Sequence, residues 1–97
     1  MLIILEDINQ YKKDYFSKSL EDLEKFISKY NPENNLLVAT IYAFDTNLTC
    51  DELIGIKKIF SNSNIRIKAF VTNSRESLIS ANSLQINTFF NWKEPVI

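Results

Sequence analysis

LLVATIYAFDTNLTCD, which is Leu36–Asp51, begins as an almost unbroken apolar run and turns polar halfway along. Such a run is typical of a strand that is covered on both faces of a sheet. Thr49 then stands three residues before Glu52, a spacing that predicts a capping box at the start of a helix. The segment therefore predicts a buried strand over Leu36–Phe44 and a helix over Cys50–Phe60.

The segments on either side predict the same alternation of strands and helices. Short apolar runs and apolar–polar alternation predict strands, whereas helical periodicity with capping residues predicts helices. The additional strands are expected over Met1–Leu5, Ile65–Thr72 and Ile86–Trp92. The additional helices are expected over Ile8–Tyr30, with a break near Tyr15–Ser19, and over Ser74–Leu84, which Asn73 and Glu76 would cap.

The 97 residues are expected to form one small α/β domain, 1–97, in the order β-α-β-α-β-α-β. Helices between consecutive strands predict right-handed crossovers and hence a mainly parallel four-stranded sheet. If the strands are added in one direction, the helices lie mostly on one face. Leu36–Phe44 is apolar on both sides, so either a helix crosses to the second face or a partner covers it. A second copy of the chain, giving a homodimer, is one candidate partner.

Composition excludes several classes of function. The formal charge is −1 and the basic residues are scattered, so no nucleic-acid partner is expected. One cysteine and no histidine exclude an internal disulfide, a soft-metal site and histidine-dependent catalysis. A single glycine excludes a glycine-rich phosphate loop, and no cofactor is expected. The chain begins without a basic leader and has no apolar run of about 20 residues, which favours a cytoplasmic protein without a membrane partner.

Polar residues follow the predicted strands, at the edge where ligands bind in open α/β sheets. They are Glu6, Asp7, Asp45, Thr72 and Lys93. The carboxylates of Glu6, Asp7 and Asp45 could hold a hard cation such as Mg²⁺, while the hydroxyl and the ammonium could bind an oxyanion. The alternative is that these acids and Thr72 cap the helices that follow the strands.

The order of these residues resembles the receiver domains of two-component signalling. That family places an acidic pair after its first strand, a phosphorylated aspartate after a later strand, and then Thr or Ser and Lys. The corresponding order here is Glu6–Asp7, Asp45, Thr72 and Lys93. Asp45-Thr-Asn-Leu is similar to the family's aspartate loop, and Ala81-Asn-Ser-Leu-Gln-Ile-Asn-Thr-Phe-Phe is similar to its last helix–strand junction. The resemblance implies a shortened, degenerate signalling domain with Asp45 as the phosphoacceptor.

A second resemblance is to the small sulfate-transporter and anti-sigma-antagonist domain. Its order of strand, helix, strand, loop, helix, strand, helix and strand is similar to that expected over nearly the full chain. Leu84-Gln-Ile-Asn-Thr-Phe-Phe is similar to the family's closing turn and strand. Leu48-Thr-Cys-Asp-Glu-Leu stands where that family carries a phosphorylated serine. This resemblance implies Thr49 as the phosphoacceptor.

Cys50 is a candidate nucleophile, because the dipole of the predicted helix would stabilise a thiolate at its start. The acidic Asp51 and Glu52 adjoin it and oppose a thiolate, so a thiol enzyme is the least favoured interpretation.

Large apolar and aromatic side chains form the remaining candidate site, because such residues commonly anchor protein interfaces. They are Tyr42, Phe44, Phe90, Trp92 and Val96. With no catalytic constellation in the sequence, we expect a non-enzymatic module that binds another protein. A small inhibitor or regulator, such as an immunity protein that neutralises a toxin, fits this expectation, and the signalling domain is the alternative.

Overall fold

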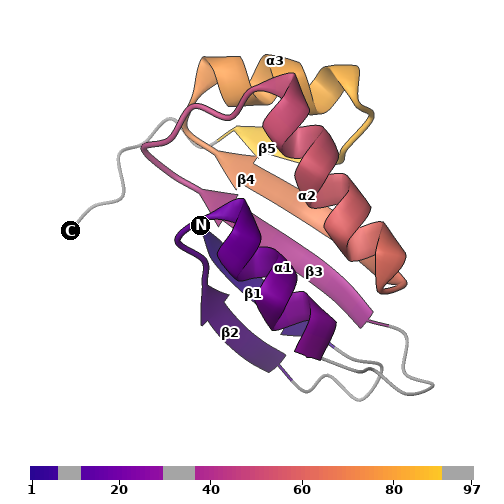
Figure 1. Cartoon of the computed structure of the whole chain (residues 1–97). Helices are drawn as coiled ribbons and strands as arrows, with labels where there is room; N and C mark the ends of the chain where they lie inside the picture. The colour runs from indigo at the N-terminus through magenta and orange to yellow at the C-terminus, as the bar shows by residue number, and fades with distance from the viewer. Residues whose placement is uncertain (7–11, 30–36, 91–97) are drawn as a thin grey trace.

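A mixed β-sheet organises the part of the chain that the computed structural model describes, residues 1–6, 12–29 and 37–90. Its elements follow one another as β1 (Leu2–Glu6), β2 (Lys12–Phe16), α1 (Leu20–Lys29), β3 (Leu37–Ala43), α2 (Cys50–Asn62), β4 (Ile65–Thr72), α3 (Arg75–Ser83) and β5 (Thr88–Phe90). The strand order across the sheet is β2-β1-β3-β4-β5. β1 runs antiparallel to both of its neighbours, whereas β3, β4 and β5 are parallel to one another (Figure 1).

Two expectations about this sheet were wrong. The described residues form five strands rather than four, and the sheet is mixed rather than mainly parallel. Both differences have one origin, because Lys12–Phe16 is a strand and not part of a helix over Ile8–Tyr30. β2 pairs antiparallel with β1, so the chain leaves the sheet at the end opposite to the one expected and β1 is reversed relative to β3. The predicted strand over Ile65–Thr72 and the start of a helix near Ser19 match the structure.

β2 is a strand because its alternate side chains find partners on two sides of the sheet. Tyr15 points toward α1 and stacks on Phe26, with the ring centroids 3.9 Å apart. The Lys13 ammonium lies 5.7 Å from the centroid of the same ring. Phe16 lies on the opposite side of the sheet, paired with Leu2. Tertiary packing of this kind decides strand formation more than local propensity does.

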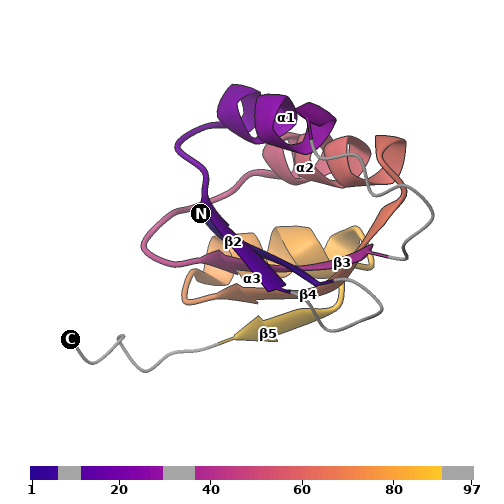
Figure 2. The ribbon, with the colours of Figure 1, turned by 90° about the horizontal axis from the view of Figure 1, so that it is seen from below.

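All three helices of the described chain lie on the same side of the sheet, with α1 and α2 above it in Figure 2 and α3 packed on β4 and β5. α1 and α2 lie side by side over the centre of the sheet, and α2 also contacts α3. The core forms between these helices and the strands, with Ile3, Leu5, Ala39 and Ile41 from the sheet and Leu23, Ile27, Leu53, Ile56 and Phe60 from the helices. Among the residues described, no helix lies over the other face of the sheet (Figure 1). We call this face, on the side away from α1, α2 and α3, the open face.

The loops after β3 and β4 are held together by polar side chains. The predicted capping box of α2 is present, because the backbone N–H of Glu52 donates to Thr49 Oγ1 at 3.2 Å and Thr49 N donates back to Glu52 Oε1 at 3.3 Å. α3 is capped by Ser74 rather than by the expected Asn73. Buried Ser77 donates to the carbonyl of Thr46 at 3.2 Å and accepts from the N–H of Leu48 at 2.8 Å. These bonds fix the loop between β3 and α2 against α3.

Candidate protein-binding surface

The predicted acidic pocket is divided between two ends of the sheet. Glu6 pairs with Val38, near the amino end of β3, whereas Asp45 follows the carboxyl end of that strand. The seven residue steps from Val38 to Asp45 correspond to about 23 Å of extended chain. The antiparallel direction of β1 causes this separation, because only parallel strands bring their carboxyl ends to one edge.

The two remaining described members of that pocket serve the local loop structure. Asp45 has a left-handed backbone with φ of 57°. Its carboxylate accepts from the side-chain amide of Asn73 at 3.0 Å, and its N–H donates to the Asn73 amide oxygen at 2.8 Å. Thr72 is fully buried and accepts from the N–H of Ser74 at 3.0 Å.

Asp7 and Lys93 lie outside the described residues. Within the described ranges, no cluster of three or more Asp, Glu or Cys side chains could hold a metal ion. The structure therefore places Glu6 and Asp45 too far apart to share a cation.

Cys50 lies exposed at the first position of α2, beside Asp51 and Glu52 in the same helical turn. Its Sγ atom lies 3.7 Å from Ser83 Oγ on α3. The Ser83 hydroxyl is not a general base, so this contact gives no support to a thiol nucleophile.

An apolar row crosses the open face from one edge of the sheet to the other. Leu2 is the register partner of Phe16 on one side and of Tyr42 on the other. Tyr42 is in turn opposite Val71, and Val71 is opposite Phe89. Directly opposed residues point to the same side of a sheet and contact their neighbours. Each of the five strands thus contributes one apolar side chain, and we call Phe16, Leu2, Tyr42, Val71 and Phe89 the apolar row.

Much of the apolar row is open to solvent. Phe16 is 66% exposed and Phe89 is 54% exposed, and these two side chains stand at opposite ends of the row. A hollow of about 420 Å³ lies along the Phe16 half of the row. It is lined by Met1, Leu2, Ile4, Phe16, Tyr42 and Phe44. None of the described helices covers this surface (Figure 1). An exposed apolar surface of this kind is typical of a contact with another macromolecule.

The open face becomes polar away from the apolar row. Moving toward the amino end of β3, the next positions on the open face include Asp14, Ile4 and Thr40, and beyond them lie Glu6, Val38 and Arg66. A register shift between Ala39 and Thr40 adds Lys68 to this part of β4. Lys68 Nζ lies 3.9 Å from Glu6 Oε2, so these side chains reach toward each other over β3.

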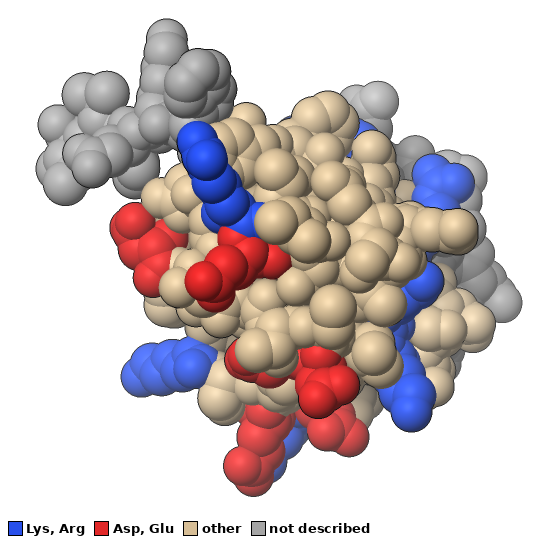
Figure 3. Space-filling view, turned by 90° about the horizontal axis from the view of Figure 1, so that it is seen from above, with Lys and Arg blue, Asp and Glu red and all other residues tan. Residues whose placement is uncertain are grey.

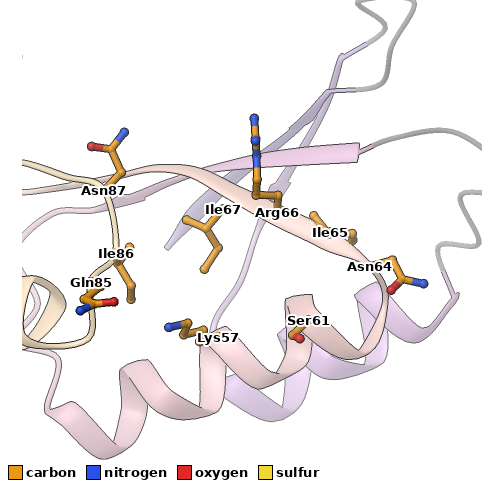
Figure 4. A pocket seen from close by; sticks show the side chains of 9 residues that line it. All are labelled: Lys57, Ser61, Asn64, Ile65, Arg66, Ile67, Gln85, Ile86 and Asn87. Carbon is orange, nitrogen blue, oxygen red and sulfur yellow. The ribbon is translucent and has the colours of Figure 1, made fainter.

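A second hollow, of about 470 Å³, lies between α2, the first half of β4 and the turn before β5 (Figure 4). It contains two cationic side chains, but they do not converge. Lys57 Nζ donates to the carbonyl of Leu84 at 3.1 Å, and Arg66 points away on the other side of β4. Lys57 and Arg66 therefore could not both contact one anion bound in this hollow.

Charge is dispersed on the surface over α3. Figure 3 shows acidic and basic side chains around the margin of a broad uncharged area, without a continuous basic field on that face. None of the helices in the described ranges combines the length and the apolar character needed to cross a membrane.

The sequence identified only part of the apolar surface. Tyr42 and Phe44 lie on the open face as part of its hollow. Phe90 is paired with Thr72 and so lies on the helix-covered side, while Trp92 and Val96 fall outside the described residues. Phe16, Leu2, Val71 and Phe89 were missed. Strict alternation along β4 would place Val71 with Ile65 and Ile67 on the helix-covered side, and only the register shift between Ala39 and Thr40 turns it to the open face. Phe16 and Phe89 depend on which strands form the edges of the sheet.

Comparison of the chain with protein-family models, with curated proteins and with solved structures finds no match. The surface geometry is therefore the basis for assigning a function.

Proposed function

We propose that this chain is a non-enzymatic protein-binding module, and that the open face is its binding surface. The observation that carries the proposal is the apolar row, which continues through all five strands and ends in two exposed phenylalanines. A small inhibitor or regulator, such as an immunity protein that neutralises a toxin, is the kind of protein that works through one such surface.

The size of the hydrophobic effect supports use of the whole row. A large aromatic side chain presents about 200 Å², so the exposed parts of Phe16 and Phe89 correspond to about 240 Å² and about 6 kcal/mol at 25 cal/mol per Å². Association costs at least about 4 kcal/mol of lost motional freedom. Two phenylalanines alone therefore give little net affinity. A stable complex needs Leu2, Tyr42 and Val71 as well.

The alternative function, a phosphorylation-controlled signalling domain, has less support from the geometry. Phosphoacceptor aspartates in receiver-like sites need a nearby cation, but Glu6 lies at the opposite end of the sheet. The Asp45 carboxylate accepts a hydrogen bond from the side-chain amide of Asn73, and Thr49 Oγ1 accepts one from the backbone N–H of Glu52 in the capping box of α2.

Affinity capture from the native host tests the proposal. The bait is the full chain, and the variants Phe89→Asp and Phe16→Asp place a charge in the apolar row. The matched control is Ile79→Asp, because Ile79 is an equally exposed apolar residue, at 68%, on α3. We expect a stoichiometric partner with the wild type and with the control, and its loss with both open-face variants.

The captured partner is then purified and titrated calorimetrically. Open-face variants that bind it as tightly as the wild type does would show that the binding surface lies elsewhere.

A further inference from the structure

We infer that the partner for which the open face is built is a second copy of this chain, docked face to face about a two-fold axis that runs along β3. This inference rests on the proposed function, since it names the protein that the same face binds. Sheets packed in this way lie about 10 Å apart and interleave the side chains of their facing surfaces.

The two-fold axis matches the apolar row to itself. β3 is the middle strand of the sheet, so rotation about it places β1 over β4 of the second copy and β2 over β5. Tyr42 then meets its own equivalent, and Leu2 meets Val71 of the second copy. Phe16 meets Phe89 of the second copy, so the two most exposed side chains of the row cover each other at both ends of the dimer.

The same rotation also matches charges of opposite sign. Glu6 belongs to β1, whereas Arg66 and Lys68 belong to β4. Placing β1 over β4 brings Glu6 of each copy over Arg66 of the other, at two symmetric positions, while Lys68 stays 3.9 Å from Glu6 of its own copy. Lys12 is the register partner of Glu6 on β2, and the strand that would face Lys12 is β5, which begins only at Thr88.

Charge distinguishes this axis from the other symmetric choice. A two-fold axis along the apolar row would also superimpose the row on itself, but each strand would then cross its own copy. The amino ends of β3 in the two copies would point in opposite directions, and the charged positions would not meet. Only the axis along β3 makes Glu6 and Arg66 partners across the interface.

The area of the face sets the expected strength. Five strands about 4.8 Å apart, over about 20 Å of strand length, give about 500 Å² of projected area per copy. Specific interfaces bury about 800 Å² of accessible surface per partner, and a corrugated face has more accessible than projected area. The dimer is thus near the lower limit of stable interfaces. We expect a dissociation constant in the micromolar range, which leaves monomers available to exchange partners.

Sedimentation velocity of the full chain, from about 1 µM to about 1 mM, measures this equilibrium. We expect the wild type and Ile79→Asp to shift from monomer to dimer over this range. Phe89→Asp and Phe16→Asp should raise the dissociation constant at least about tenfold, since each buries a charge in an apolar contact. Circular dichroism verifies folding, which these exposed positions should not disturb.

A charge-exchange experiment tests the axis. Glu6→Lys alone and Arg66→Glu alone each place like charges together twice in a homodimer, and we expect each to weaken self-association about tenfold. In an equimolar mixture of the two variants, the mixed dimer has opposite charges at both positions. We expect its dissociation constant to return to within about threefold of the wild type.

Three results would overturn the inference: a folded wild type that stays monomeric at 1 mM, a dimer unaffected by Phe89→Asp, or a mixture that associates no better than its components. A monomeric wild type whose captured partner still depends on the open face removes only the homodimer. A partner that ignores the open-face variants removes the proposed function itself.

Discussion

Asp45 shows how one residue can suggest chemistry and serve structure. It stands where a phosphoacceptor would be expected after a central strand, yet its backbone is left-handed and its side chain is bonded to Asn73 on the neighbouring loop. Left-handed backbone is tolerated by aspartate and asparagine better than by other residues with a Cβ atom. An aspartate at this position is therefore explained by the left-handed backbone and by the hydrogen bond to Asn73.

Substitution of Asp45 separates these two roles. Asp45→Asn keeps the tolerated backbone and an acceptor for Asn73, so we expect its free energy of unfolding to change by less than about 0.5 kcal/mol. Asp45→Ala loses the acceptor and places alanine at positive φ, which should cost about 1–2 kcal/mol. Urea unfolding measures both values.

Phosphotransfer is the independent readout at Asp45. With acetyl phosphate and Mg²⁺, we expect no label on the wild type. A Mg²⁺-dependent label that disappears in Asp45→Asn would instead support the signalling domain.

Among the elements, the prediction and the structure differ most at the junction of β2 and α1, where one helix was expected and a strand followed by a helix is found. The stripe that contains Tyr15 has helical spacing, but its aromatic ring packs on Phe26 from a strand. The local sequence does not distinguish a helix from a strand over Lys12–Phe16, because this segment is a strand through its pairing with β1. By contrast, Thr49 and Glu52 determine a local bond pattern three residues apart, and the predicted start of α2 matched the structure.

The acid stability of this junction can be predicted from Asp22 in the first turn of α1. A hydrogen bond from the Tyr15 hydroxyl, together with one from the N–H of Lys18, lowers the pKa of the Asp22 carboxyl from its ordinary value of 3.8. A lowered pKa in the folded state contributes stability that is present above the ordinary value and is lost as pH falls through the folded value. Asp22→Asn should therefore be less stable than the wild type at neutral pH, and the difference should shrink below about pH 4.

Thermal unfolding of both proteins from pH 7 to pH 2.5 measures this difference. Glu24→Gln, at an exposed position of the same helix, is the control. A gap between the wild type and Asp22→Asn that stays constant with pH would contradict the link between β2 and α1.

At the scale of the whole molecule, the one-sided sheet was predictable although its strand count was not. The apolar residues on both sides of β3 required cover for a second face, and parallel crossovers placed α2 and α3 on one side. The ends of the apolar row were beyond prediction, because they depend on which strands occupy the edges. Phe16 lies on the open face only through β2, a strand that the periodicity did not indicate.

We propose that the open face is covered by protein where the chain works. Hydroxyl-radical footprinting in cells that naturally produce the chain tests this, against the purified chain at about 10 nM, where a dimer with a micromolar dissociation constant is dissociated. We predict that oxidation of Phe16, Tyr42 and Phe89 falls severalfold in the cell while oxidation of Ile79, on the opposite side of the molecule, does not change. Equal oxidation of the three aromatic side chains in both settings would contradict the account.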